Sequence, residues 1–253
     1  MTAVAEPRRG PGSLRALGVS RSFQGLQALQ DVDLDLGPDE VVGLIGPNGA
    51  GKTTLVNLLT GFDLPSSGRI ELGDREITRW PPHRRGRAGL ARTFQHGRLF
   101  RELTVRENVE VAALGVGASP GEARRRAAEL LDLLGLAERA HQRAAVLPHG
   151  DERRLGVARA LALRPRFVLM DEPAAGLHEG EIPAFAAVVR SVRDEFGAGV
   201  LLIDHNVALI MEVCDRVHVL DRGCTLAQGT PAEIRANPEV ATAYLGVGGG
   251  AHA

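Results

Sequence analysis

The apolar residues of this chain follow two patterns, which predict two kinds of β-strand. Val32, Leu34 and Leu36 alternate with aspartates, and this predicts a strand with one buried and one exposed face. Elsewhere the apolar runs are short and lack a polar face, as is typical of parallel strands covered on both sides. These runs occupy residues 41–45, 167–170 and 200–203. We therefore expect a mostly parallel core sheet, with an antiparallel β region near the N-terminus.

Helical patterns lie between the apolar runs. The first covers residues 53–60 and ends at Gly61, a residue type that commonly terminates helices. Strands that alternate with helices predict an α/β fold, and in such folds ligands bind beyond the carboxyl ends of the parallel strands. Candidate binding residues are therefore those that directly follow the apolar runs.

The middle of the chain has a different character. Residues 121–164 contain three consecutive arginines, a leucine-rich amphipathic stretch and a second helical pattern from Asp151 to Leu163. We predict a mainly helical subdomain over residues 93–166, inserted between two parts of the core. Those two parts of the core are residues 13–92 and 167–246.

The apolar run at 41–45 leads directly into a P-loop motif, G-x-x-x-x-G-K-[ST]. Its residues are Gly46, Pro47, Asn48, Gly49, Ala50, Gly51, Lys52 and Thr53. The glycines let backbone N–H groups surround phosphate oxygens, and the following helix directs its positive end at them. We expect Lys52 to reach the β- and γ-phosphates of a nucleotide and the Thr53 hydroxyl to ligate Mg²⁺.

Four further candidates follow apolar runs or open the helical segment. Beside a P-loop, Asp171 could hold Mg²⁺ through water, and Glu172 could orient or deprotonate the attacking water. His205 could reach the γ-phosphate, although an isolated histidine at a strand end is usually structural. Gln95 is a candidate sensor of water and Mg²⁺, with an ordinary surface glutamine as the alternative.

The sequence says less about the nucleotide base. An N-K-x-D motif for guanine is impossible, because Lys52 is the only lysine among the 30 basic residues. Phe23 lies upstream of the P-loop and could stack on adenine. On composition alone, a phenylalanine of the core is an equally good interpretation.

Composition narrows the class of protein. The net charge of −1 gives no electrostatic reason to expect binding to nucleic acid. No apolar run approaches the roughly 18 residues that cross a bilayer, and the polar start does not read as a signal peptide, so we expect a cytoplasmic protein. Cys214 and Cys224 form no C-x-x-C motif, and we expect both to be buried and reduced. The small-residue termini, 1–12 and 247–253, are expected to be disordered.

These motifs resemble the ATP-binding cassette (ABC) ATPases of membrane transporters over about residues 14–246. Several stretches are similar to the ATPase subunits of branched-chain amino-acid importers in particular. They are LIGPNGAGKTTLVNLLTGF at 44–62, GLARTFQHGRLFRELTVRENV at 89–109, DEPAAGL at 171–177 and GTPAEIRANPEVATAYLG at 229–246. The resemblance implies a P-loop NTPase core of the RecA-like type, and an ATP hydrolase that uses ATP and Mg²⁺.

The resemblance also assigns roles to single residues. Phe23 looks like the adenine-stacking aromatic residue, and Gly46 to Thr54 look like the Walker A motif. Catalysis would rest on Lys52, the Q-loop Gln95, the carboxylate Glu172 and the switch residue His205. The metal would rest on Thr53, Gln95 and the Walker B residue Asp171.

In this family two cassettes pair head to tail, and each ATP lies between one subunit's Walker A motif and the partner's signature helix. The resemblance therefore implies a second ATPase subunit, permease subunits in the membrane and, indirectly, an extracytoplasmic solute-binding protein. It places the chain on the inner face of the cell membrane. Leu99 and Phe100 are candidates for the docking patch, with ordinary core residues as the alternative.

The chain departs from the family at the signature, which is usually L-S-G-G-Q. The corresponding residues here are Leu147, Pro148, His149, Gly150 and Asp151. Pro148 has neither a hydroxyl nor an N–H group, and a lost hydrogen bond to phosphate is worth roughly 1.5–3 kcal/mol. We expect Asp151 to cap the following helix and to bring a carboxylate near the partner's γ-phosphate. His178 replaces the usual Asp or Asn of the D-loop. These departures suggest a heterodimer with two unequal sites.

Two other functions stay open. One is the ATPase of an exporter, including relatives that export lipopolysaccharide. The other is a soluble cassette protein of translation or DNA repair, although such proteins usually carry two cassettes or long extensions. A P-loop kinase or GTPase is disfavoured by Glu172, His205 and the helical segment. The transported solute, whether a branched-chain amino acid or another small polar or carboxylate compound, is set by other subunits.

Overall fold

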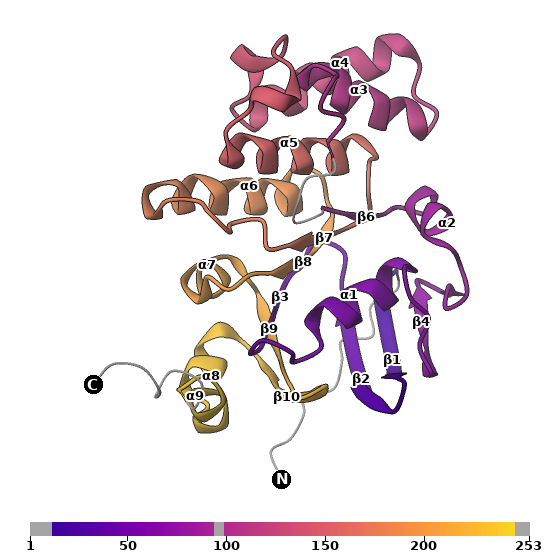
Figure 1. Cartoon of the computed structure of the whole chain (residues 1–253), viewed down its shortest axis with the longest axis vertical. Helices are drawn as coiled ribbons and strands as arrows, with labels where there is room; N and C mark the ends of the chain where they lie inside the picture. The colour runs from indigo at the N-terminus through magenta and orange to yellow at the C-terminus, as the bar shows by residue number, and fades with distance from the viewer. Residues whose placement is uncertain (1–11, 94–98, 246–253) are drawn as a thin grey trace.

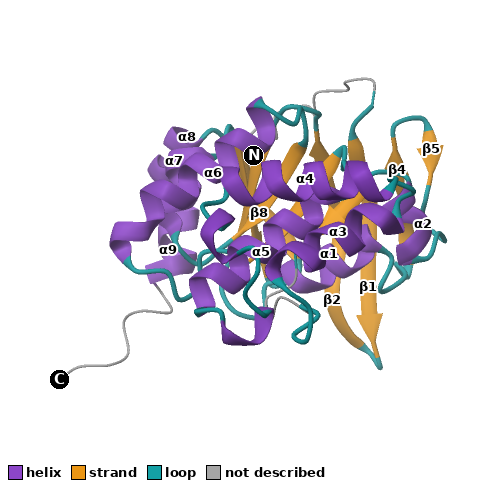
Figure 2. Cartoon of the chain, turned by 90° about the horizontal axis from the view of Figure 1, so that it is seen from above, coloured by secondary structure: helices purple, strands orange, loops and turns teal. Residues whose placement is uncertain are grey.

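The computed structural model describes residues 12–93 and 99–245. The expected disorder of the termini, apart from Gly12, and the position of Gln95 lie outside these ranges. Within them the strands form a four-stranded sheet in the order β2-β1-β4-β5 and a six-stranded sheet in the order β10-β9-β3-β8-β7-β6. Figures 1 and 2 show the helices arranged around these sheets.

The larger sheet is mostly parallel. Its strands are β3 (Val41–Ile45), β6 (Leu90–Arg92), β7 (Phe167–Asp171), β8 (Gly199–Ile203), β9 (Arg216–Asp221) and β10 (Cys224–Gly229). The first five pair in parallel, and β10 is antiparallel to β9 at one edge. The sequence prediction of a mostly parallel α/β sheet is confirmed.

The continuous apolar runs are explained by burial on both faces of this sheet. Val41, Val168 and Val200 belong to one core cluster, which also contains residues of the helices α3 to α7 on that face of the sheet. Their neighbours along the chain, Val42, Leu169 and Leu201, join a second cluster on the other side. Because successive side chains of a strand point to opposite faces, a strand covered on both faces has no position for a polar residue.

The second cluster joins the two sheets around one helix, α1 (Lys52–Thr60). The smaller sheet is antiparallel, as expected for the N-terminal region. Its strands are β1 (Leu14–Phe23), β2 (Leu26–Leu36), β4 (Ser67–Leu72) and β5 (Arg75–Glu76). The alternation in β2 buries Val32, Leu34 and Leu36, but Asp35 is also buried, because the end of β2 lies against β9 and Arg216 donates to the Asp35 carbonyl. Burial raises the pKa of Asp35, and the Arg216 charge opposes this shift.

A buried arginine fastens the end of α1. Arg85 lies on α2 (Pro82–Arg87) and is 1% exposed. Its guanidinium donates hydrogen bonds to four backbone carbonyls, those of Leu58, Leu59, Thr78 and Trp80. Burial lowers the pKa of Arg85 to about 10. Two of these carbonyls belong to the last turn of α1, where carbonyl groups have no partner within the helix.

The segment between β6 and β7 is helical in its described part and lies at the top of Figure 1. It comprises α3 (Val105–Gly115), α4 (Pro120–Leu133), η1 (Ala137–Arg139), η2 (Ala144–Val146) and α5 (His149–Ala162). Capping boxes begin α3 and α4, at Thr104 with Glu107 and at Ser119 with Glu122. The helices share their core with one face of the parallel sheet.

The remaining elements follow β7 and complete the cover of the sheet. They are η3 (Glu179–Glu181), α6 (Ile182–Asp194), α7 (Val207–Val213), α8 (Pro231–Ala236) and α9 (Pro238–Leu245). Both cysteines are free, but the prediction that both are buried is wrong for Cys224. Cys224 lies on the edge strand β10 and is exposed, whereas Cys214 is buried and burial raises the pKa of its thiol. In the described ranges, no helix has the length and apolar character to cross a bilayer.

Candidate nucleotide-binding site

The P-loop connects the carboxyl end of β3 to the start of α1. Gly46, Gly49 and Gly51 have positive φ values of 155°, 80° and 102°, a conformation that favours glycine. A Cβ atom on Gly46 would lie 2.2 Å from the Leu220 carbonyl oxygen, and one on Gly51 would lie 2.8 Å from the Ala28 carbonyl oxygen. The turn therefore favours glycine at all three positions, and the neighbouring backbone also excludes a Cβ atom at Gly46 and Gly51.

Lys52 places its ammonium group inside this loop. Its Nζ donates to the carbonyl oxygens of Gly46 at 2.6 Å and Pro47 at 3.0 Å, and the residue is 8% exposed. Burial lowers the pKa of Lys52, and the charges of Glu172 and Asp171 oppose this shift. A cation held in a loop of backbone amides suits a polyphosphate.

The structure brings most of the predicted residues to one cavity of about 470 Å³. The predicted residues that line it are Asn48, Gly49, Ala50, Gly51, Lys52, Thr53, Thr54, Glu172 and His205. They come from the carboxyl ends of β3, β7 and β8, which are neighbours in the sheet. Residues far apart in the sequence meet here because parallel strands end at the same edge.

Glu172 is the most constrained residue of the site. Its φ of 49° lies in the left-handed region, which is uncommon for a residue with a Cβ atom. Its N–H group donates to the Ile203 carbonyl at 2.7 Å, and its carbonyl accepts from Arg153 of α5. Its Oε1 lies 2.7 Å from Nε2 of His205. Because an ionised carboxylate only accepts, this ring nitrogen carries the hydrogen.

The two neighbours of this pair have different partners. The Asp171 carboxylate receives a hydrogen bond of 2.7 Å from Arg92, and both side chains are about one-tenth exposed, at 11% and 10%. Arg92 also donates to Asn57 of α1 at 2.7 Å. The Asp204 carboxylate accepts from the backbone N–H groups of Ala174 and Asn206, at 2.9 and 2.8 Å. Asp204 therefore holds the loops that carry Glu172 and His205.

Phe23 ends β1 and is not a core residue, since it is 42% exposed. It does not line the cavity, and the Arg21 guanidinium lies 4.5 Å from the centre of its ring. The cavity wall at this side is made instead by Leu26, Gln27 and Ala28, at the start of β2. The sequence carried no signal for these three residues.

Arg222 is a further lining residue that sequence reasoning missed. It sits with a φ of 45° in the turn between β9 and β10, and this turn docks on the P-loop. The N–H of Gly223 donates to the Ala50 carbonyl at 3.1 Å, and the Gly223 carbonyl accepts from Gln30 at 2.8 Å. The Asp-Arg-Gly triplet of the sequence predicts a turn, but it does not indicate that this turn packs against the P-loop.

The signature residues lie at the start of α5. Leu147 is buried, and Pro148 occupies the N-cap position without a side-chain hydrogen bond. The expectation that Asp151 caps the helix is wrong, because α5 begins at His149 and Asp151 lies within its first turn. The Asp151 carboxylate instead pairs with Arg139 at 2.9 Å and Arg154 at 3.6 Å.

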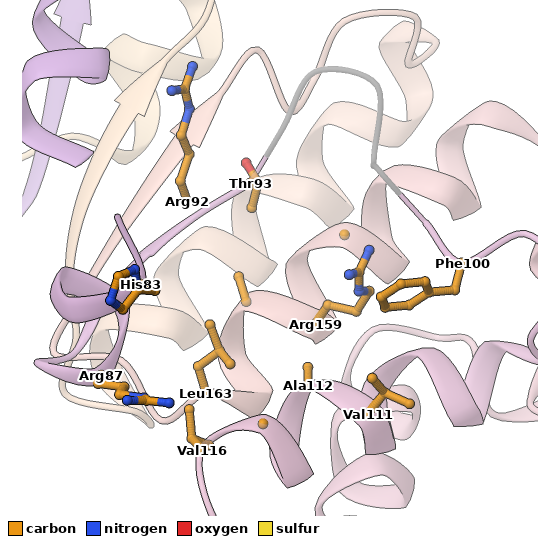
Figure 3. A pocket seen from close by; sticks show the side chains of 14 residues that line it. His83, Arg87, Arg92, Thr93, Phe100, Val111, Ala112, Val116, Arg159 and Leu163 are labelled. Carbon is orange, nitrogen blue, oxygen red and sulfur yellow. The ribbon is translucent and has the colours of Figure 1, made fainter. Parts of the chain in front are cut away.

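A second cavity of about 510 Å³ lies between α2, α3 and α5 (Figure 3). Phe100 lines it and is 47% exposed, with the Arg159 guanidinium 4.9 Å from the centre of its ring. Leu99 is partly buried against the core. The alternatives for the two residues thus separate: Leu99 packs as a core residue and Phe100 faces solvent. We name this cavity the α2–α3–α5 groove.

The donor set of the first cavity fits a nucleotide with its metal ion. Thr53 is exposed at the cavity, where its hydroxyl can serve as a ligand. In the described part of the chain there is no group of three or more His, Cys, Asp or Glu that would hold an ion alone. Mg²⁺ bound with a nucleotide takes only one or two protein ligands, because phosphate oxygens and water supply the others.

The comparisons with known proteins agree with this geometry. A sequence model described as ABC transporter matches residues 29–175, and one described as branched-chain amino acid ATP-binding cassette transporter matches residues 224–249. The chain is 44% identical over 244 residues to the high-affinity branched-chain amino acid transport ATP-binding protein LivG of Escherichia coli, covering 90% of this chain and 96% of LivG. It is 38% identical over 233 residues to the lipopolysaccharide export system ATP-binding protein LptB of Acidithiobacillus ferridurans, covering 92% and 96% of the two chains.

The fold comparison points the same way. The crystal structure of an ATP-binding cassette of an ABC transporter in its ADP conformation matches with a TM-score of 0.84 and 28% identity, covering 93% of this chain and 99% of that one. These similarities extend over nearly the whole chain, from the antiparallel sheet to α9, and they agree with the geometry of the P-loop. The chain belongs to the ABC transporter family, as an ATP-binding and ATP-hydrolysing cassette.

Proposed function

We propose that this chain is the ATPase subunit of an importer for branched-chain amino acids or similar small polar or carboxylate solutes. The observation that carries the proposal is the 44% identity to LivG over 90% of the chain. The match of residues 224–249 to the branched-chain cassette family supports the same solute class.

In this proposal the P-loop residues bind the phosphates of ATP. Backbone N–H groups of residues 46–54 and the ammonium of Lys52 take the phosphate oxygens, and Phe23 stacks on adenine after leaving Arg21. Thr53, Asp171 and Gln95 would hold Mg²⁺, which would neutralise phosphate charge when bound. Asp171 would exchange part of its contact with Arg92 for this role.

Glu172 acts as the general base that orients and deprotonates the attacking water, and His205 keeps its carboxylate in place. The geometry supports this assignment. The 2.7 Å contact with Nε2 of His205 holds one oxygen of the Glu172 carboxylate, and both residues line the cavity. A general base must lie within hydrogen-bond reach of the water it activates, and its orientation decides whether it does.

Two cassettes would pair head to tail, with each ATP between one P-loop and the signature of the other subunit. Pro148 caps α5 without a side-chain donor, so the signature lent to the partner is weaker than a serine signature. The Asp151 charge, however, is offset by Arg139 and Arg154. We therefore place the defect of the signature at Pro148, in a heterodimer with two unequal sites.

The α2–α3–α5 groove is the proposed docking site for a helix of the permease subunits. Exposed apolar side chains, Phe100, Val111 and Val116, line it together with His83 and Arg87 of α2 (Figure 3). Monomeric proteins rarely leave such a patch uncovered. In this arrangement the chain lies on the cytoplasmic face of the membrane, and closure of the cassettes on ATP drives alternating access.

The proposal is tested by transport. The full chain is purified from host membranes with the subunits bound to it, reconstituted into proteoliposomes and assayed for ATP-dependent movement of labelled leucine. The complex carrying Glu172→Gln serves as the control with only residual turnover. We expect leucine to move toward the side of the ATPase. ATP hydrolysis without movement of any branched-chain or carboxylate solute would reject the solute class.

An exporter ATPase is the second candidate, because LptB is also similar over nearly the whole chain. The same proteoliposomes distinguish the two candidates, since an exporter moves its substrate away from the side of the ATPase. Co-purification with ribosomes or DNA rather than permeases would favour a soluble cassette protein.

A further inference from the structure

Arg153 links the signature helix to the proposed general base of the same chain. It lies on α5, one turn after Pro148, and its guanidinium donates to the backbone carbonyl of Glu172. The other end of this guanidinium lies beside the loop that follows β7, since a Cβ atom on Gly176 would be 3.9 Å from the second terminal nitrogen. The contact joins residues that are 19 positions apart in the sequence.

Arg153 contacts Glu172, a residue whose backbone conformation needs contacts from other parts of the chain to be stable. The φ of 49° at Glu172 lies in the left-handed region, which is unfavourable for a residue with a Cβ atom. The Ile203 carbonyl fixes one side of this residue, and Arg153 fixes the peptide on the other side. A change of the backbone conformation at Glu172 would move its side chain relative to His205.

Other contacts join the first turns of α5 to the same loop. Arg154 pairs with Glu181 at 3.6 Å, and a Cβ atom on Gly150 would lie 3.4 Å from Leu177. The start of α5 and the segment 172–181 are therefore packed as one unit. A displacement at the signature would be passed directly to the backbone of Glu172.

We propose that Arg153 is a positioning residue for Glu172. Through it, the helix that offers its signature to the partner's ATP also sets the orientation of the carboxylate that acts on this chain's own ATP. This inference rests on the proposed role of Glu172 as general base. It goes beyond that role by naming a residue outside the nucleotide cavity that controls it.

The test replaces Arg153 by Met, which keeps much of the side-chain volume but cannot donate, and by Lys, which keeps a cationic donor. Arg190→Met on α6, which removes an exposed ion pair with Glu212, is the matched control. For each full-length variant in the assembled complex, we would measure kcat and KM for ATP, the Kd of ATP and the Tm.

We expect Arg153→Met to lower kcat by about 10- to 100-fold, the scale of a misplaced catalytic group, while KM and Kd stay unchanged. Arg153→Lys should recover part of kcat, and Arg190→Met should retain all of it. In a Glu172→Gln background, Arg153→Met should lower the residual turnover no further, because the group it positions is gone.

Two results would overturn the inference. One is an unchanged kcat in Arg153→Met. The other is a loss that appears in Kd and Tm and persists in the Glu172→Gln background, as a purely structural residue would show. Failure of the proposed function would look different, because Glu172→Gln would then retain turnover whatever the residue at position 153.

Discussion

The imidazole of His205 lies within hydrogen-bond distance of the Glu172 carboxylate, with 2.7 Å between Nε2 and Oε1. Glu172 directly follows β7, and His205 lies two residues after the end of the neighbouring parallel strand β8. The loops that carry them are joined by Asp204, which accepts hydrogen bonds from both. The position of the Glu172 carboxylate is therefore fixed by the backbone at this edge of the sheet and not by the side chain alone.

Glu172→Gln should lower ATP hydrolysis to a small residual rate while ATP binding survives. The amide is nearly isosteric and can still accept from His205, but it cannot take a proton from water, and general-base catalysis contributes about 10²–10⁴-fold. Phosphate release and the binding of a fluorescent ATP analogue measure the two properties separately. Turnover close to that of the unaltered chain would reject Glu172 as the base.

Lys52→Arg should lower ATP affinity or turnover by at least about tenfold, the equivalent of 1.4 kcal/mol. The Lys52 ammonium is packed against the Gly46 and Pro47 carbonyl oxygens at 2.6 and 3.0 Å, and the broad guanidinium fork does not fit in the same space. The charge is preserved, so the change isolates shape. Arg190→Lys on the surface of α6 is the control, and equal effects of the two substitutions would contradict the prediction.

Pro148→Ser should raise the ATPase rate of the assembled complex by about tenfold or more, because it restores a hydroxyl donor worth roughly 1.5–3 kcal/mol toward the partner's phosphate. It should not lower the Tm, since Pro148 contributes no side-chain hydrogen bond to the cap of α5 and serine is a favourable N-cap residue. A steady-state ATPase assay of the complex is the measurement. An unaltered rate, or a fully active homodimer of this chain, would remove the argument for unequal sites.

His218 should make the folded chain sensitive to acid. Burial, assisted by Arg216, lowers the pKa of His218 from 6.5 to about 3, so the folded state keeps the ring neutral. Below pH 6.5 the unfolded chain takes up a proton that the folded chain does not, and the free energy of unfolding falls by about 1.4 kcal/mol per pH unit until pH 3.

The variant His218→Gln, which keeps a polar partner for Thr225, should flatten this pH dependence by that amount. Urea unfolding at several pH values between 7 and 4 measures it. The exposed His141→Gln serves as the control and should leave the pH dependence as it is. Parallel slopes for all three proteins would show that His218 does not govern acid stability.

The strands β3, β7 and β8, the end of β2 and the phosphate loop could be predicted because their causes are local. The apolar run at 41–45 and the glycines at 46, 49 and 51 determine a buried strand and a tight loop wherever the chain places them. The carboxyl ends of parallel strands lie at the same edge of a sheet. This places the ends of β7 and β8 beside the phosphate loop, and it brings Glu172 and His205 together. These parts needed no knowledge of distant contacts.

The rest depended on contacts between segments far apart in the sequence. The alternation in β2 gave no indication that Asp35 is buried, because its cover comes from β9, which lies 181 residues further along the chain. Asp151 does not cap α5, because the helix begins two residues earlier at His149, and its carboxylate pairs with Arg139 of η1. The Glu172 conformation and the Arg153 contact have no counterpart in local composition. Each of these features is set by an arginine that arrives from another element or by the shape of a loop.

The clamp of Arg85 on the end of α1 completes the picture of basic residues in this chain. One side chain there serves four carbonyl groups in different directions, which only a branched guanidinium with five N–H groups can do. A homologue from a lysine-rich genome would have to keep arginine at position 85, just as this arginine-rich chain keeps lysine at position 52. Lysine and arginine can replace each other at most surface positions. At the start of α1 only lysine fits, and at its end only arginine does.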